Sequence, residues 1–235
     1  MSQLDGVPTA PPVLAGVGLA KNYGATLALR EASLEVARGG SVAVMGPSGS
    51  GKSTLLYCLA GVVTPDRGAV TFDGVRIDEH SDARRSELRC SEFGFVFQFP
   101  GLLPELSADE NVALPLMLSG VGRRTAVARA RQLFPALGID GLESRRPGEL
   151  SGGEAQRVAI TRALILEPAV VFADEPTGSL DTMAGDEVMS LLVSTVRERQ
   201  SALVLVTHDE RVARRCDRII RVVDGRTVPL HGVEG

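Results

Sequence analysis

Residues 46–54 combine three glycines, four hydroxyl side chains and one lysine in the pattern G-x-x-x-x-G-K-[ST]. An apolar run at 41–45 precedes them and an apolar stretch that starts at Leu55 follows them, which predicts a strand, a tight turn and a helix. In such a turn, glycines let successive backbone N–H groups point at an anion, and the helix start adds the positive end of its dipole. Lys52 can reach the β- and γ-phosphates of a nucleotide, and the Ser53 hydroxyl can bind Mg²⁺.

The residues that we expect to bind nucleotide phosphates form one continuous stretch of the chain. They are Gly46, Pro47, Ser48, Gly49, Ser50, Gly51, Lys52, Ser53 and Thr54. The chain has only two lysines, Lys21 and Lys52, which argues against a chance match at the lysine position. A glycine-rich turn with a purely structural role is the alternative interpretation.

Other apolar, strand-like runs also end in polar residues that are suited to catalysis. Gln98, Asp174 and His208 each stand at the end of such a run, and Glu175 follows Asp174 directly. In an open parallel sheet, the carboxyl ends of the strands lie along one edge, where ligands bind. We therefore expect these residues to meet Gly46 and the rest of the phosphate loop in one site.

The side-chain chemistry suggests a role for each of these residues. Mg²⁺ prefers oxygen ligands, so we expect Ser53, Gln98 and Asp174 to bind it. Glu175 can accept a proton from the water that attacks the γ-phosphate, a contribution typically worth ~10²–10⁴-fold in rate. His208 can hydrogen-bond the γ-phosphate or hold that water, and Gln98 can sense metal or water. Taken alone, each residue could instead have no role in catalysis, for example as a solvated acid in a turn or as a structural histidine.

A second potential anion site lies at Ser151, Gly152 and Gly153, directly before another helical pattern. The physical reason is again a helix start that presents free N–H groups and positive dipole charge. The alternative is a serine that caps the helix, followed by flexible glycines. Two such sites in one chain make sense if each nucleotide is held by the first site of one subunit and the second site of another.

Length and composition favour one large α/β domain. The chain has 235 residues, 44% of them hydrophobic, which is enough for a well-buried core. We expect the domain to span residues 13–235, with a mainly helical insertion at about 100–150 and a disordered tail at 1–12. The tail lacks a basic region followed by an apolar core, so we do not expect a signal peptide there.

Hydrophobic patterns indicate where strands and helices alternate along the chain. The expected strands are 13–19, 27–36, 41–45, 69–72, 93–97, 169–173, 202–206 and 219–223. The expected helices are 52–61, 82–89, 125–137, 152–166 and 184–199. This alternation predicts a mostly parallel sheet covered by helices.

Composition also argues against several classes of function. A net charge of -4 gives no reason to expect nucleic-acid binding. The three cysteines are far apart in sequence, which suggests neither a zinc site nor a disulfide framework. The chain contains no apolar stretch of ~18 residues, so we expect membrane contact only through a partner protein.

Taken together, the motifs resemble those of the ATP-binding cassette (ABC) ATPases and occur in the order that this family has. The set comprises GPSGSGKST, Gln98, LSGGEAQ, VVFADE, Ser179-Leu180-Asp181 and Thr207-His208. The resemblance implies a P-loop NTPase core with a mostly parallel sheet, an N-terminal antiparallel β subdomain and an inserted helical subdomain. It also implies a head-to-tail dimer with two ATP molecules, each held by the phosphate loop of one subunit and by Ser151 and Gly153 of the other.

Two further residues match positions of this family. Tyr23 matches the aromatic residue that stacks on adenine, although a surface or core tyrosine is a real alternative at this position. Asp181 matches the loop that communicates across the dimer. The resemblance therefore adds Tyr23 and Asp181 to the residues that we expect to contact ATP or its surroundings.

The segment after Gln98 resembles one branch of the family, the lipoprotein-release and macrolide-efflux ATPases. The matching residues are Leu102-Leu103-Pro104, the stretch 106–112, Leu114-Pro115-Leu116 and the stretch 174–181. Ala155 departs from this pattern, which often has glutamine or another long polar residue there. The branch resemblance implies an ATPase subunit, expected as a homodimer, on the cytoplasmic face of the membrane, where it pairs with a separate permease.

Two other classes of function are the alternatives. An ABC ATPase with a non-transport role, in cell division, DNA repair, chromosome organisation or translation, would also carry these motifs. However, chromosome-type members have a very long coiled coil before the signature, and translation factors have two cassettes in one chain. A P-loop kinase or GTPase would lack both the LSGGEAQ signature and a residue equivalent to His208.

Overall fold

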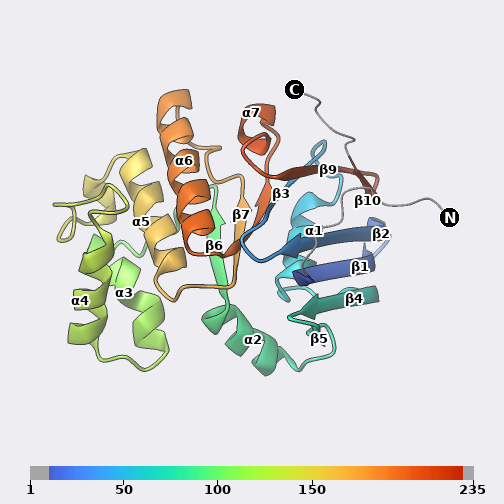
Figure 1. Cartoon of the computed structure of the whole chain (residues 1–235), viewed down its shortest axis with the longest axis horizontal. Coiled ribbons are helices and arrows are strands. Elements are labelled where there is room, and N and C mark those ends of the chain that lie inside the picture. The colour runs from blue at the N-terminus through green and yellow to red at the C-terminus, as the bar shows by residue number, and fades with distance from the viewer. Residues whose placement is uncertain (1–10, 230–235) are drawn as a thin grey trace.

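The computed structural model describes residues 11–229 and contains two β-sheets with helices around them (Figure 1). The smaller sheet is antiparallel and has the strand order β2-β1-β4-β5. The larger sheet has the order β10-β9-β3-β8-β7-β6, in which only the β9–β10 pair is antiparallel. The strands are β1 (Pro12–Tyr23), β2 (Thr26–Ala37), β3 (Ser41–Met45), β4 (Arg67–Phe72), β5 (Val75–Arg76), β6 (Phe93–Phe97), β7 (Val170–Asp174), β8 (Ala202–Val206), β9 (Arg218–Val223) and β10 (Arg226–Pro229).

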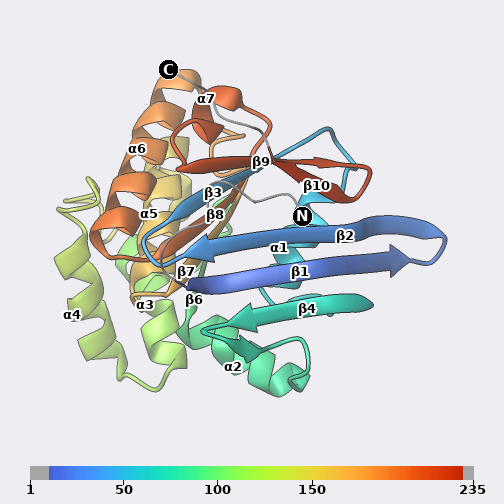
Figure 2. The same cartoon turned by 45° about the vertical axis from the view of Figure 1, so that its right-hand side comes forward.

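Helices cover both faces of the larger sheet. They are α1 (Lys52–Leu59), α2 (Asp82–Ser91), α3 (Ala108–Leu118), α4 (Arg123–Leu133), α5 (Gly152–Leu164), α6 (Thr182–Glu198) and α7 (Glu210–Ala213), with a short 3₁₀ helix at Pro147–Glu149. In Figures 1 and 2, α1 lies between the two sheets, whereas α5 and α6 lie on the opposite face of the larger sheet. Among residues 11–229, no helix has the length and the apolar character needed to cross a membrane.

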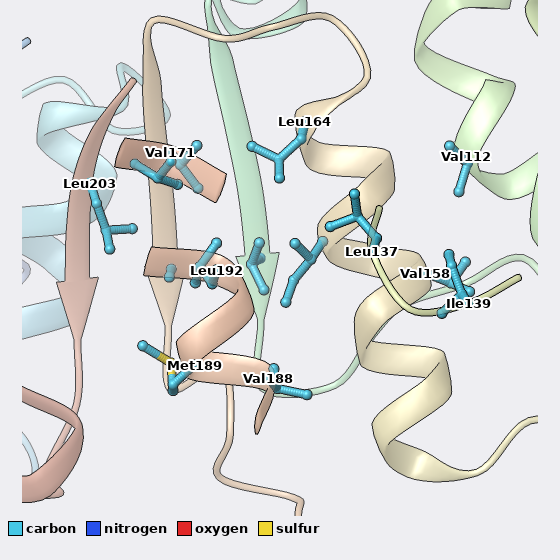
Figure 3. Close-up of a cluster of buried hydrophobic side chains, with 14 of the residues drawn as sticks. Val112, Leu137, Ile139, Val158, Leu164, Val171, Val188, Met189, Leu192 and Leu203 are labelled. Atoms are coloured by element: carbon cyan, nitrogen blue, oxygen red, sulfur yellow. The ribbon is translucent and has the colours of Figure 1, made fainter. Parts of the chain in front are cut away.

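The parallel strands β3, β7 and β8 are continuous apolar runs because alternate side chains enter two different cores. Val42 and Val44 of β3 belong to the core that α1 and the antiparallel sheet close, whereas Ala43 faces the other core. That second core joins the sheet to α3, α4, α5 and α6 (Figure 3), and it includes Val171, Leu203 and Leu192. Both faces of the sheet are therefore buried, and its polar chemistry is confined to the strand ends.

The fold class predicted from the sequence is confirmed, since the chain has a mostly parallel sheet, an antiparallel β subdomain and a helical insertion. Helices α3 and α4 lie within the predicted insertion at about 100–150, and α3 packs against both α4 and α5. The extent of the whole domain, residues 13–235, stays a prediction.

Several element boundaries were predicted wrongly. Strands β1 and β2 have 12 residues each, against seven and ten expected, because register shifts along their pairing hide the alternation of apolar residues. The helix predicted at 125–137 is α4, which begins and ends earlier. Of the tail predicted to be disordered, residues 1–10 lie outside the described residues, whereas Pro12 is already part of β1.

Helix α3 was not predicted as a separate element of the helical insertion. Pro115 lies inside this helix, where it removes one helical hydrogen bond. At the start of the helix, the Glu110 carboxylate accepts from the Ser107 N–H at 3.0 Å, and the Asp109 carboxylate accepts from the Glu110 N–H at 2.8 Å.

Candidate functional site

The carboxyl ends of four neighbouring strands form one edge of the larger sheet, as the sequence predicted. In strand order β3, β8, β7, β6, these ends lead to Gly46, His208, Glu175 and Gln98. The register confirms the alignment, since Asp174 pairs with Val206 on one side and with the end of β6 on the other. The geometry therefore gathers the predicted catalytic groups beside the predicted phosphate loop.

The phosphate loop requires glycine at the points where it touches other strands. Gly46 and Gly51 have φ values of 149° and 105°, which few side-chain-bearing residues adopt. A Cβ on Gly46 would lie 2.2 Å from the carbonyl oxygen of Val222, and one on Gly51 would lie 2.3 Å from that of Ala28. The loop is thus wedged between β9 and β2, which fixes its curled shape without any ligand.

The interior of this loop fits an anion. The Lys52 ammonium donates to the carbonyl oxygens of Gly46 and Pro47, each at 2.9 Å, so the positive charge is held at the loop itself. The Ser50 hydroxyl is buried and has no hydrogen-bond partner within residues 11–229. Helix α1 starts at Gly51 without a side-chain cap, which leaves its first N–H groups free for a ligand.

Asp174 lies next to the start of α1. Burial raises the pKa of the Asp174 carboxyl above its usual value, and hydrogen bonding from the Ser53 hydroxyl opposes this rise. The negative charge of Glu175 raises that pKa further, whereas the charge of Lys52 lowers it. The structure thus brings together Ser53 and Asp174, two of the three predicted metal ligands, as a pair of oxygen donors.

Glu175 and His208 contact each other directly. The Glu175 Oε1 atom lies 2.9 Å from Nδ1 of His208, and the two side chains are 22% and 75% exposed. Glu175 has a φ of 50°, and its backbone N–H donates to the Val206 carbonyl oxygen at 2.9 Å. A left-handed non-glycine residue costs roughly 1–2 kcal/mol, and such strain is concentrated at functional sites. The backbone at Glu175 therefore aims its carboxylate along the sheet edge toward His208.

Gln98 lies at the same edge, next to the turn that follows Glu175. The Ser179 hydroxyl donates to the Gln98 carbonyl oxygen at 2.8 Å, and a Cβ on Gly178 would lie 3.0 Å from Gln98 Nε2. These contacts connect the end of β6 to the segment that precedes Asp181. A metal contact of Gln98 stays a prediction.

Ser151, Gly152, Gly153 and Asp181 line a separate cavity of about 480 Å³ where α5 and α6 begin. The Ser151 hydroxyl caps α5 by accepting from the Glu154 N–H at 3.3 Å, while the Glu154 carboxylate accepts from the Ser151 N–H at 2.7 Å. Asp181 caps α6 in the same way, by accepting from the Ala184 N–H at 3.0 Å. Two helix N-termini therefore converge on this cavity.

The cavity and the phosphate loop are separate within one chain. All nine residues of the loop 46–54 lie in the described part of the chain, and none of them lines the cavity at Ser151. The two predicted halves of a nucleotide site are thus present, but this chain does not bring them together by itself.

Tyr23 is the last residue of β1, next to the turn that joins β1 to β2. Its side chain is half exposed, and the Lys21 ammonium lies 5.9 Å from the centre of its ring. Lys21 is itself held by Asp66 at 2.9 Å and by the carbonyl oxygen of Thr64 at 2.8 Å. One face of the ring is thus near a fixed cation, and adenine stacking stays a prediction.

Sequence reasoning missed two side chains of α5 that support the Gln98 region. The buried Gln156 donates to the Phe97 carbonyl oxygen at 2.9 Å, and Arg162 donates to those of Pro100 and Gly101 at 2.7 and 2.8 Å. Their acceptors are backbone atoms, which leave no signature in side-chain patterns. The helical spacing of α5 alone could not have revealed these contacts.

Comparison with known proteins agrees with this geometry. Residues 29–178 match the family model described as "ABC transporter". The chain is 46% identical over 214 residues to the lipoprotein-releasing system ATP-binding protein LolD of Geobacter metallireducens, covering 89% of this chain and 95% of that protein. The LolD protein of Bordetella pertussis is 48% identical over 201 residues, which covers 86% of this chain and 87% of the relative.

Solved structures show the same fold. A dimeric ATP-binding cassette in a post-hydrolysis state, bound to ADP and Pi, matches with a TM-score of 0.83 and 35% identity, over 93% of this chain and 99% of that one. A second match is cbiO1 from Clostridium perfringens, part of the ABC transporter complex cbiONQ. Its TM-score is 0.84 and its identity 32%, over 92% of this chain and 87% of that one.

Proposed function

This chain belongs to the ABC transporter family as an ATP-hydrolysing subunit, and from that premise we propose that two copies bind Mg²⁺-ATP between them and drive a lipoprotein-releasing permease. One observation carries the proposal. The phosphate loop and the cavity at Ser151 are both preformed, yet one chain keeps them apart. A second copy in head-to-tail orientation would bring its own cavity against the phosphate loop of the first.

The roles of the residues follow from their positions. Lys52 and the free N–H groups at the start of α1 hold the phosphates in one subunit, while Ser151 and Gly153 of the second copy close the site. Ser53 and Asp174, with Gln98, would hold Mg²⁺. When bound, this ion neutralises charge on the phosphate oxygens.

Hydrolysis then depends on the contact between Glu175 and His208. Glu175 takes a proton from the attacking water, and general bases of this kind are typically worth ~10²–10⁴-fold in rate. His208, 2.9 Å from the Glu175 carboxylate, fixes the orientation of that group. Its side chain is 75% exposed, so the ring nitrogen that does not face Glu175 can reach a phosphate at the closed interface.

The permease is the partner that the relatives suggest, and this site offers a surface for it. Phe99 and Leu103 follow Gln98 and are 70% and 43% exposed. Both side chains belong to one short segment beside Gln98, where we expect them to form part of an apolar contact surface. We place the subunit on the cytoplasmic face of the membrane, with membrane contact only through the permease and no nucleic-acid partner.

Complementation between two inactive variants tests whether one nucleotide site uses two chains. Lys52→Ala disables the phosphate loop, and Ser151→Arg blocks the start of α5, so neither variant alone should hydrolyse ATP. A mixture should regain ATPase activity, because the mixed dimer has one site built from the intact loop of one chain and the intact Ser151 of the other. If each chain carried a complete site, every chain in the mixture would still be defective.

A matched control shows whether loss of a helix cap alone explains the result. Ser81 caps α2 as Ser151 caps α5, by accepting from the Arg84 N–H at 3.3 Å. Ser81→Arg should therefore retain ATPase activity. An inactive mixture of the Lys52 and Ser151 variants, together with an active Ser81→Arg protein, would refute the shared site.

A further inference from the structure

Asn111 lies fully buried in the first turn of α3, and its carboxamide is bonded to the backbone that precedes the helix. The Oδ1 atom accepts from the Leu103 N–H at 2.8 Å. The Nδ2 group donates to the carbonyl oxygens of Leu103, Leu106 and Ser107 at 3.1, 3.2 and 3.0 Å. Both N–H groups and the oxygen of this side chain are therefore engaged by one short stretch of backbone.

The stretch concerned, residues 99–107, connects the predicted catalytic edge to the helical subdomain. It begins directly after Gln98 and has no helix or strand of its own. Its first part is fixed by Arg162, which donates to the carbonyl oxygens of Pro100 and Gly101. Its second part is fixed by Asn111. Side chains of α5 and α3 thus hold the two parts of one irregular segment.

A buried asparagine that needed only a partner for itself could have used its own helix. The bond to the Ser107 carbonyl oxygen, four residues back, is of that local kind. The other three bonds reach Leu103 and Leu106, outside the helix. If the segment moved away, the carboxamide would remain buried without partners, which is costly. Asn111 therefore acts as a latch on the segment.

We propose that Asn111 is a positioning residue that presets the segment 99–107, so that the exposed side chains of Phe99 and Leu103 meet the permease in a fixed arrangement. This proposal rests on the proposed function, since it assumes a permease that docks beside Gln98. Preorganisation of a docking segment removes the cost of ordering it on binding. Asn111 itself touches neither nucleotide-binding nor catalytic residues in the contacts described above.

The first part of the test measures the segment directly by hydrogen exchange in the subunit without nucleotide. Asn111→Ala should speed exchange of the Leu103 amide by roughly tenfold or more, since that amide loses its acceptor. Asn111→Ser also removes the carboxamide but keeps a small polar group, so it should speed exchange of the Leu103 amide too, and it serves if the alanine variant does not fold. Unchanged exchange at Leu103 in Asn111→Ala would overturn the latch.

The second part measures coupling in the complex with the permease. In Asn111→Ala, the KM for ATP and the basal rate of the isolated subunit should stay within about twofold of wild type, because no nucleotide contact changes. Stimulation of the ATPase by the permease should fall severalfold. Full stimulation despite rapid exchange at Leu103 would overturn the proposal.

Arg131→Gln is the matched control for general weakening of the same subdomain. Arg131 of α4 donates to the buried Asp109 of α3 at 2.8 Å, and Asp109 also accepts from the Ser107 hydroxyl at the end of the segment. Loss of Arg131 leaves all four bonds of Asn111 to the segment 99–107 in place. Its loss should lower stability while leaving permease stimulation intact. Equal loss of stimulation in both variants would show a merely structural role and overturn the proposal. If the wild-type subunit were not stimulated by the permease, the proposed function would fail, and the exchange result alone would decide the latch.

Discussion

Gly51→Ala tests whether the close approach of the phosphate loop to β2 requires glycine at this position. Gly51 has a φ of 105°, and a Cβ there would lie 2.3 Å from the Ala28 carbonyl oxygen, where ordinary contact begins near 3.4 Å. Either β2 or the loop must move by about 1 Å in a close-packed region. Backbone strain of roughly 1–2 kcal/mol and overpacking of roughly 1–3 kcal/mol together predict a loss of about 2–5 kcal/mol in the free energy of unfolding.

Gly49→Ala is the matched control in the same loop. Gly49 also has a left-handed φ of 76°, but apart from Gly49 and its two chain neighbours, no residue in the range 11–229 has an atom within 4 Å of a Cβ added there. Only the strain remains, so the expected loss is about 1–2 kcal/mol. Urea unfolding of both variants without nucleotide measures the difference. Equal stability of the two variants would refute the claim that contact between the loop and β2 requires glycine at Gly51.

Three further predictions concern single residues. Lys52→Ala should weaken ATP binding at least tenfold in a calorimetric titration, since its ammonium is the fixed charge of the loop, and unaltered affinity would count against that role. Tyr23→Ala should weaken binding of ATP but leave tripolyphosphate binding unchanged, because the ring stacks only on the base. An equal loss of affinity for both ligands would contradict stacking by Tyr23. Hydrogen bonds from the Ser107 N–H and from Arg123 lower the pKa of the Glu110 carboxyl from 4.5 to about 2. The ionised carboxylate therefore stabilises the folded protein fully above pH 4.5, and this stabilisation is lost as the pH falls toward 2. Glu110→Gln should therefore destabilise the protein in urea at pH 7, and by less below pH 4.5; a difference that does not change with pH would refute this.

The catalytic edge could be predicted from sequence because its signals are local. A buried parallel strand is a short apolar run, and the residue after it must lie at the carboxyl edge of the sheet. Gly46, Gln98, Glu175 and His208 were found in this way, and the structure brings their strand ends together. The family prediction is also confirmed by the match over residues 29–178.

The missed features depend on contacts that the pattern of side chains in the sequence does not mark. The latch at Asn111 and the bonds from Arg162 have backbone carbonyl oxygens as acceptors, which every residue offers, so no sequence pattern marks them. Strands β1 and β2 were predicted too short because irregular register breaks their alternation. The contact of Glu175 with His208 required the spacing of two neighbouring strands, which sequence order alone does not give.

The central claim is that two copies of this chain close on ATP, with the phosphate loop of one against the start of α5 in the other. Glu175→Gln should keep ATP binding and nearly abolish hydrolysis, so the closed pair should accumulate. Light scattering of this variant with Mg²⁺ and ATP, with the permease present in a parallel sample, tests the claim most directly. The account predicts a shift from one chain to two that depends on ATP and is lost when Ser151→Arg is added. A variant that stays monomeric in ATP under both conditions, or that hydrolyses ATP at the wild-type rate, would contradict it.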